Sequence, residues 1–171
     1  RGEIMDGQEL SMRRARPSDA GRIAEFVNNA LERDGLVDRH VVVARLGEVG
    51  LLLAEENGTL RGLLGWRVEN LVACVVDLII APARYRQMVG RRLFEQMEAA
   101  AADLQAEAAI LFLPPTYPKE LASFLEDLGY LPRSVRTLRS AWREMAYQAG
   151  RDDKDEIPVK QHSSEEVSRP L

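Results

Sequence analysis

The spacing of the apolar positions changes along the chain, and it is helical near the start. A short strand is expected over 12–16, and the proline, serine and aspartate at 17–19 then form a cluster typical of a helix start. The apolar residues that follow trace one helical face, which is ended at 34–35 by Asp-Gly: Ile23, Phe26, Val27, Ala30 and Leu31. The segment 38–47 stays open between a second helix and a strand, which its three consecutive valines favour.

Three strands are predicted in succession in the middle of the chain. The first, 51–55, is followed at 57–58 by Asn-Gly, a pair that strongly favours a tight hairpin turn. The second covers 60–68 and turns at 69–70, and the third covers 71–80. Because connections this short join antiparallel neighbours, the three strands are expected to form an antiparallel meander.

The third strand leads into a turn that is rich in positive charge. Its β-branched apolar run is typical of a buried strand, and it stops at Pro82, which cannot continue a sheet ladder. An amphipathic helix follows Gly90, with these residues on its apolar face: Leu93, Phe94, Met97, Ala100, Ala101 and Leu104. Four arginines crowd the turn with no acid among them: Arg84, Arg86, Arg91 and Arg92. Because the first N–H groups of a helix can bind an anion, the turn is a candidate site for a phosphorylated ligand.

The last part of the chain alternates between strands and helices. A strand over 108–113 completes a strand–helix–strand sequence, which implies a right-handed parallel crossover. A helix then begins at Pro118 and is stopped by a glycine, with one apolar face: Leu121, Phe124, Leu125 and Leu128. A further helix is expected over 138–149 and a final strand over 155–160.

Composition favours one globular domain with a sizeable core. The chain has 171 residues, 46% of them hydrophobic, a net charge of −4 and a pI near 5.4. This balance argues against a general nucleic-acid binder, and no apolar run reaches the roughly 20 residues of a membrane helix. Because Cys74 is the single cysteine and no signal-like apolar region is present, we expect a cytoplasmic protein. We expect a flexible lead over 1–11, one domain over 12–162 and a flexible tail over 163–171.

The charged turn resembles the acyl-CoA loop of the GCN5-related N-acetyltransferase (GNAT) superfamily. In that family an apolar strand ends in V-x-P, and Y-R-G-x-G-I-G-x-x-L follows. The positions that fall in register here are Ile80, Pro82, Gly90 and Leu93. The match is partial, because Tyr85 stands at the family's Arg/Gln position, and Arg86 and Met88 stand at its first two glycine positions. The segment FLEDLGY, 124–130, also looks like the family's Y-E-K-L-G-F segment.

The resemblance extends over about 12–162 and implies a fold and a reaction. The fold is α/β (α+β), a mixed and mostly antiparallel central sheet with a splayed parallel strand pair and flanking helices, and 38–47 takes the place of its second helix. The reaction is acetyl transfer from acetyl-CoA, as cosubstrate, to an unidentified small-molecule or peptide amine, by direct attack on the thioester. Backbone N–H groups over 79–81 would contact the oxyanion. The implied cosubstrate-binding residues are Ile79, Ile80, Ala81, Tyr85, Arg86, Gln87, Met88, Val89, Gly90 and Arg91.

The residues available for acid–base chemistry depart from the family's pattern. The family's general acid is a tyrosine four residues before the glycine of the L-G-F/Y segment, and Leu125 stands there, on an apolar helix face. The asparagine that often lies seven residues earlier is Pro118. Asp77 is the one acid inside the central strand, where partial desolvation would raise the pKa of its carboxyl toward that of a general base. The alternative for Asp77 is a buried hydrogen bond or salt bridge, and Glu55 is expected to be an ordinary exposed turn residue.

The same departures support two other hypotheses. Tyr85 and Met88 would close the pyrophosphate site if their side chains filled it, which would leave a catalytically silent GNAT-fold domain with a binding or regulatory role. A homodimer-forming regulatory module is the other hypothesis, with Trp142 as an interface element or, equally well, as part of the core. The arginines have an ordinary alternative role as surface cations paired with the chain's acids. No set of His, Cys, Asp and Glu has metal-ligand spacing.

Overall fold

The computed structural model describes residues 3–5, 8–32, 35–113 and 119–162, without the side chains of 3–5 and 8. The chain divides into two compact units: unit 1 comprises Arg1–Arg67 and Asp77–Met97, and unit 2 comprises Val68–Val76 and Glu98–Leu171. The strands lie in the order β1-β2-β3-β4-β5-β6-β8-β7, with β5 and β6 parallel. The expected α/β class, with a mixed and mostly antiparallel sheet, is confirmed.

Unit 1 contains the meander and the helices next to it. Its elements are β1 (Glu3–Met5), β2 (Gln8–Arg14), η1 (Pro17–Asp19), α1 (Ala20–Ala30), α2 (Arg39–Leu46), β3 (Gly50–Glu56), η2 (Ala83–Tyr85) and most of α3 (Arg86–Asp103). Strands β4 (Thr59–Glu69) and β5 (Val72–Ile80) belong to both units. The segment 38–47 is a helix despite its valines, because the Asp38 carboxylate accepts the Val41 N–H at 3.0 Å and Val42 is buried.

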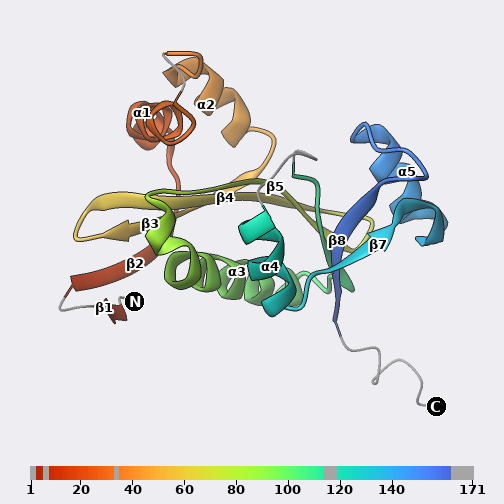
Figure 1. Ribbon diagram of the computed structural model, residues 1–171. Coiled ribbons are helices and arrows are strands. Elements are labelled where there is room, and N and C mark those ends of the chain that lie inside the picture. Colours follow the sequence, from red (N-terminus) through yellow and green to blue (C-terminus); the bar gives the residue numbers. More distant parts are fainter. Residues whose placement is uncertain (1–2, 6–7, 33–34, 114–118, 163–171) are drawn as a thin grey trace. The chain divides into compact units, whose positions relative to one another are not determined.

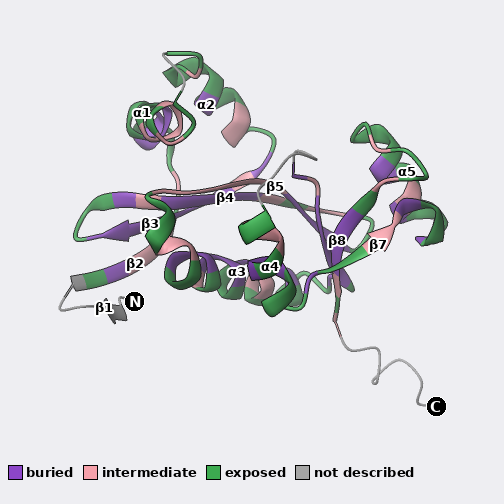
Figure 2. Cartoon of the chain, in the orientation of Figure 1, coloured by how far each residue is buried: buried purple, intermediate pink, exposed green. Residues whose placement is uncertain are grey.

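Two glycines of β4 show how the two faces of the sheet are covered in unit 1. A Cβ at Gly62 would lie 2.7 Å from Val89 Cγ1, so the start of α3 packs closely on this face. A Cβ at Gly65, three residues on and therefore on the opposite face, would lie 2.9 Å from Leu51 Cδ2 and 3.0 Å from Asp77 Cβ. In this unit α1 and α2 lie over that second face (Figure 1), and β3 is buried along most of its length (Figure 2).

The structure places strands at 3–5 and from residue 8 onward, within the range 1–11 where a flexible lead was expected. Strand β2 begins at Gln8 and pairs antiparallel with β3, with Leu10 opposite Glu56. Leu10 is fully buried. Leu10 and Met12 are the only apolar residues of this strand, so pairing with β3 holds it in place more than its own hydrophobic pattern does. Residues 1–2 and 6–7 and the expected tail over 163–171 lie outside the described residues.

Unit 2 is built around the parallel pair. Its further elements are β6 (Ala108–Leu111), α4 (Lys119–Asp127), β7 (Leu131–Ser134), η3 (Val135–Thr137), α5 (Ser140–Gln148) and β8 (Glu156–Gln161). Val72–Val75 of β5 pair with β6, and β8 lies between β6 and β7. Trp142 is 4% exposed and packs in the core with the buried Cys74, so the core reading of both residues is confirmed. Strand β7 was not predicted, because its Pro132 obscures a strand pattern.

None of the helices in the described part of the chain combines the length and the apolar character that a bilayer crossing needs.

Candidate active site

The loop expected to bind a phosphorylated ligand joins β5 to α3 in unit 1. Strand β5 ends at Ile80, and the short helix η2 leads into α3, which begins at Arg86. Val89 and Gly90 are buried, and they anchor the first turns of α3. Arg84, Gln87 and Arg91 are exposed. The loop therefore presents positive side chains beside the N-terminus of a long helix, a combination that favours a bound anion.

Tyr85, a bulky residue of this loop, is held by side chains of β3 and β4. The Tyr85 hydroxyl donates a 2.8 Å hydrogen bond to Glu56 Oε1, and the guanidinium of Arg61 lies 4.7 Å from the centre of its ring. Arg84 stacks on the same ring at 4.9 Å. The Met88 side chain is 43% exposed. Tyr85 is thus held by residues of β3, β4 and its own loop, which argues against the expectation that its side chain closes the site.

The backbone at the end of β5 has one N–H group that points away from β4. The Ala81 N–H donates to the Arg61 carbonyl at 3.0 Å. Because N–H groups alternate along a strand of an antiparallel pair, the Ile79 N–H also points to β4 and the Ile80 N–H points to the opposite side. Of the three N–H groups expected to contact an oxyanion, only that of Ile80 has this orientation.

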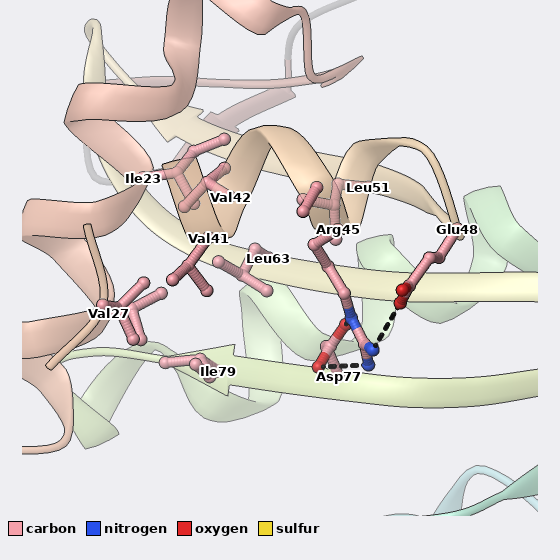
Figure 3. Close-up of a pocket in the computed structure, with 12 residues that line it drawn as sticks. Ile23, Val27, Val41, Val42, Arg45, Glu48, Leu51, Leu63, Asp77 and Ile79 are labelled. Carbon is pink, nitrogen blue, oxygen red and sulfur yellow. Dashed lines mark hydrogen bonds and ion pairs between the residues drawn. The ribbon is translucent and has the colours of Figure 1, made fainter. Parts of the chain in front are cut away.

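A cavity of about 470 Å³ lies in unit 1, between α1, α2 and the strands β3, β4 and β5 (Figure 3). Its walls are aliphatic, with three charged side chains at Arg45, Glu48 and Asp77. The lining residues come from the two helices, the segments on either side of α2 (Val37 and Glu48), the start of β3 and positions of β4 and β5. On β5, Asp77 and Ile79 both face the cavity, because residues two apart in a strand point to the same side of the sheet. Leu63 faces the cavity from β4.

Asp77 is bound by Arg45 in this cavity. Arg45 Nε donates to Asp77 Oδ2 at 2.9 Å, and Nη2 donates to Oδ1 at 3.0 Å, so the contact is bidentate. The hydrogen bonds from Arg45 to Asp77 outweigh burial and raise the pKa of the guanidinium. The Asp77 side chain keeps 28% of its exposure and faces the cavity. It is therefore half of an ion pair at a cavity wall, as the salt-bridge alternative described, and not an isolated buried acid.

Sequence reasoning missed Arg45 and mistook Glu55. Arg45 lies on a helix that the three valines obscure, and its partner is 32 residues away. Glu55 is 7% exposed, and it accepts from Arg13 Nε at 2.6 Å and from Arg22 Nη2 at 2.8 Å. Burial alone would raise the pKa of Glu55, but the hydrogen bonds from Arg22 and Arg13 outweigh it and hold the pKa below its ordinary value. The expectation that Glu55 is exposed is wrong, because Arg13 on β2 and Arg22 on α1 both bind it.

In unit 2, the positions that correspond to the family's tyrosine segment are structural. Leu125 is 1% exposed, which confirms its place in the core. Tyr130 is also 1% exposed, and its hydroxyl donates to Glu98 at 2.9 Å while Lys160 Nζ pairs with the same carboxylate at 2.6 Å. Burial and the neighbouring Glu98 carboxylate raise the pKa of Tyr130. Pro118 lies outside the described residues.

Comparison with known proteins shows the fold. No family model matches this sequence, and no curated protein sequence matches it either. A GNAT-family acetyltransferase structure from Staphylococcus aureus Mu50 aligns with a TM-score of 0.66 at 11% identity, over 89% of this chain and 98% of that one. This chain has the GNAT fold.

Two further GNAT-fold structures were solved with coenzyme A. PaiA N-acetyltransferase from Thermoplasma acidophilum aligns with a TM-score of 0.60 at 14% identity, over 90% of this chain and 99% of that one. N-acetylglutamate synthase from Neisseria gonorrhoeae, complexed with coenzyme A and N-acetyl-glutamate, aligns with a TM-score of 0.62 at 16% identity. That alignment covers 90% of this chain but only 35% of the synthase, so this GNAT-fold protein spans about a third of the synthase's length.

Replacing Gly65 by alanine is expected to lower the free energy of unfolding by about 2 kcal/mol, because the new methyl group would overlap the Asp77 carboxylate and Leu51. Urea unfolding followed by circular dichroism measures this change. Gly21→Ala is the matched control: nothing lies within 4 Å of a Cβ at Gly21 on α1, so alanine should leave stability unchanged or raise it by up to about 1 kcal/mol. Equal effects of the two substitutions would show that Asp77 does not need the space at Gly65.

Proposed function

We propose that this protein is an acetyl-CoA-dependent N-acetyltransferase that acts on an amine bound in the cavity of unit 1. The observation that carries the proposal is the cavity itself, whose wall includes Asp77 and Ile79 of β5, the strand that leads into the arginine-rich loop. Its volume lies within the range of small-molecule sites. Coenzyme A in two neighbouring structures supports the choice of cosubstrate.

The pyrophosphate of acetyl-CoA would bind at the start of α3. Backbone N–H groups of the first turn of α3, over 87–89, would be the main donors, and Arg86 and Arg91 would add charge. The contacts of the Tyr85 side chain with Glu56 and Arg61 support this assignment, because they hold the side chain against β3 and β4. Ile79 to Ala81 would flank the thioester.

Acetyl transfer requires a base for the amine, a hydrogen-bond donor for the oxyanion and a proton for the leaving thiolate. The ammonium group loses a proton to the base, and its nitrogen attacks the thioester carbonyl carbon. The nitrogen of the tetrahedral intermediate then loses a second proton to water as the C–S bond breaks, which gives the amide and the CoA thiolate, and the thiolate takes a proton from water. The Ile80 N–H is the oriented donor for the oxyanion. Asp77 is the proposed base; both its oxygens accept from Arg45, so the amine or a water must reach a carboxylate lone pair that Arg45 leaves open.

Calorimetric titration with acetyl-CoA, and with free CoA alongside, tests the proposal. Binding in the micromolar range is expected for both ligands, because the thioester contributes little beyond the nucleotide and pantetheine. Absence of heat at millimolar acetyl-CoA would contradict the proposal and favour the catalytically silent GNAT-fold domain.

Reversing the charge at Arg86 or Arg91 is expected to weaken CoA binding by about tenfold each and to reduce its salt dependence. Glutamate at a helix start is compatible with the helix dipole, so folding should be preserved. Arg136→Glu, on η3 in unit 2, is the control for net charge, because Arg136 is exposed and distant in sequence from the loop. Unchanged affinity in both loop variants would remove the arginines from the proposed site.

A further inference from the structure

The walls of the cavity in unit 1 are almost wholly aliphatic. Nine of its twelve lining residues are valine, isoleucine, leucine or alanine, and no aromatic residue is among the twelve. They come from several elements and include Ile23 of α1, Val42 of α2, Leu51 of β3 and Leu63 of β4 (Figure 3). A polar ligand would lose its hydration against such walls without gaining hydrogen bonds, so the cavity favours an apolar group.

The charged side chains of the cavity leave no cation free for a carboxylate. Arg45 donates from Nε and Nη2 to Asp77, and from Nη1 to Glu48 at 3.3 Å, so every guanidinium nitrogen already has a carboxylate partner. One arginine against two acids gives the lining a net charge of −1. The Glu48 side chain is 65% exposed and Asp77 28% exposed, so both carboxylates remain accessible to a ligand. This arrangement attracts an ammonium group and repels a carboxylate.

We infer that the acceptor is a primary amine on an uncharged apolar body, without a carboxylate beside the amine. This inference rests on the proposed function. The ammonium group lies against Asp77 and Glu48, and the apolar body lies among the side chains of α1, α2 and β4. The size of the cavity suits molecules such as hexylamine and 2-phenylethylamine. Acidic amino acids and polyamines are excluded, the first by charge and the second by the aliphatic walls.

Matched pairs of amines test the inference with the 171-residue chain. Release of the CoA thiol is measured with 2-phenylethylamine against phenylalanine, which adds only a carboxylate, and with hexylamine against hexamethylenediamine, which adds only a second amine. We expect kcat/KM to be at least about tenfold higher for 2-phenylethylamine than for phenylalanine and for hexylamine than for hexamethylenediamine, which corresponds to about 1.4 kcal/mol or more. Equal or better turnover of phenylalanine or hexamethylenediamine would overturn the inference.

Binding measurements separate this inference from the proposed function. Saturation-transfer NMR with 2-phenylethylamine and phenylalanine reports occupancy of the cavity without acetyl-CoA. If acetyl-CoA fails to bind but 2-phenylethylamine binds in preference to phenylalanine, the proposed function fails and the ligand class stands. If acetyl-CoA binds but neither hexylamine nor 2-phenylethylamine binds or is acetylated, the inferred ligand class is wrong and the proposed function stands.

Two pairs of variants locate the effect in the cavity. Val41 lines it and Val43 of the same helix does not, although the two residues are similarly exposed, at 49% and 42%. Val41→Gln should raise KM for hexylamine about tenfold with kcat little changed, and Val43→Gln should leave KM unchanged. Glu48→Gln should raise KM about threefold, whereas Glu25→Gln, an exposed residue of α1 outside the lining, should not. Equal effects within each pair would place the amine elsewhere.

Discussion

Asp77→Asn is expected to lower the turnover of hexylamine by about a hundredfold, with folding and CoA affinity preserved. Asparagine keeps the shape of the side chain but cannot take a proton from the attacking amine, and loss of a general base typically costs this much. The measurement is kcat at saturating acetyl-CoA, with thermal unfolding and CoA calorimetry as checks on the fold and on the cosubstrate site.

A double-mutant cycle distinguishes the base from a merely structural partner of Arg45. Arg45→Gln removes the bidentate contact but leaves the Asp77 carboxylate in the cavity wall. If Asp77 is the base, Asp77→Asn still lowers kcat strongly in the Arg45→Gln background. If Asp77 only holds Arg45 in place, the second substitution adds nothing to the first. The second result, or loss of folding in Asp77→Asn alone, would assign Asp77 a structural role.

Asp19→Asn is expected to lower the free energy of unfolding by about 3 kcal/mol at neutral pH. Asp19 Oδ1 accepts from Arg13 Nη2 at 2.6 Å and Oδ2 from Arg13 Nη1 at 2.9 Å, and the carboxylate is only 10% exposed. An asparagine still accepts the Arg16 N–H, which lies 2.7 Å from Oδ2, so the loss reports the ion pair and not the cap.

The contribution of Asp19 to the free energy of unfolding should decrease at acidic pH. Hydrogen bonds from Arg13, opposed by burial, hold the pKa of Asp19 well below its ordinary value. The ion pair therefore stabilises the fold fully above the unfolded pKa of about 4, and its contribution is lost as the pH falls through the lower folded pKa. The difference between the urea midpoints of the wild-type and Asp19→Asn proteins should be the same from pH 5 to 7. The two midpoints should converge below about pH 4.

Asp38→Asn is the matched control for this charge removal. Asp38 is exposed and caps α2 by accepting the Val41 N–H at 3.0 Å, a role that asparagine performs as well. The free energy of unfolding of the Asp38→Asn variant should differ from that of the wild type by less than about 0.5 kcal/mol at any pH. An equal loss in both variants would mean that general charge balance, and not the contact between Asp19 and Arg13, stabilises unit 1.

The order of the elements could be predicted from the sequence because local signals determined it. The Asn-Gly pair at 57–58 marks the β3–β4 turn, and both residues have positive φ, 47° and 81°. The proline at 82 and the amphipathic pattern after Gly90 marked the end of β5 and the course of α3. Helix α2 was assigned through the resemblance and not through its valines, because its burial is confined to Val42.

The candidate site could be predicted only in part, because its contacts join residues far apart in the chain. Asp77 was singled out as an acid in an apolar strand, but its partner on α2 carries no local signal of pairing. Tyr85 raised the expectation of a blocked loop, and only the position of Glu56, 29 residues earlier, shows where its side chain goes. Glu55 was misjudged for the same reason, since Arg13 and Arg22 approach it from separate elements.

The two glycines of β4 also couple the two proposed half-sites of the reaction. Gly62 receives the start of α3 on one face, and Gly65 receives Asp77 on the other, within three residues of the same strand. A ligand that restricts the motion of β4 from one face leaves less conformational freedom for the second ligand to remove. Acetyl-CoA and the amine should therefore each strengthen the binding of the other by the same factor, since a coupling free energy is reciprocal. The packing around β4 would therefore make the binding of the two substrates cooperative, in addition to the contact that they make when they react.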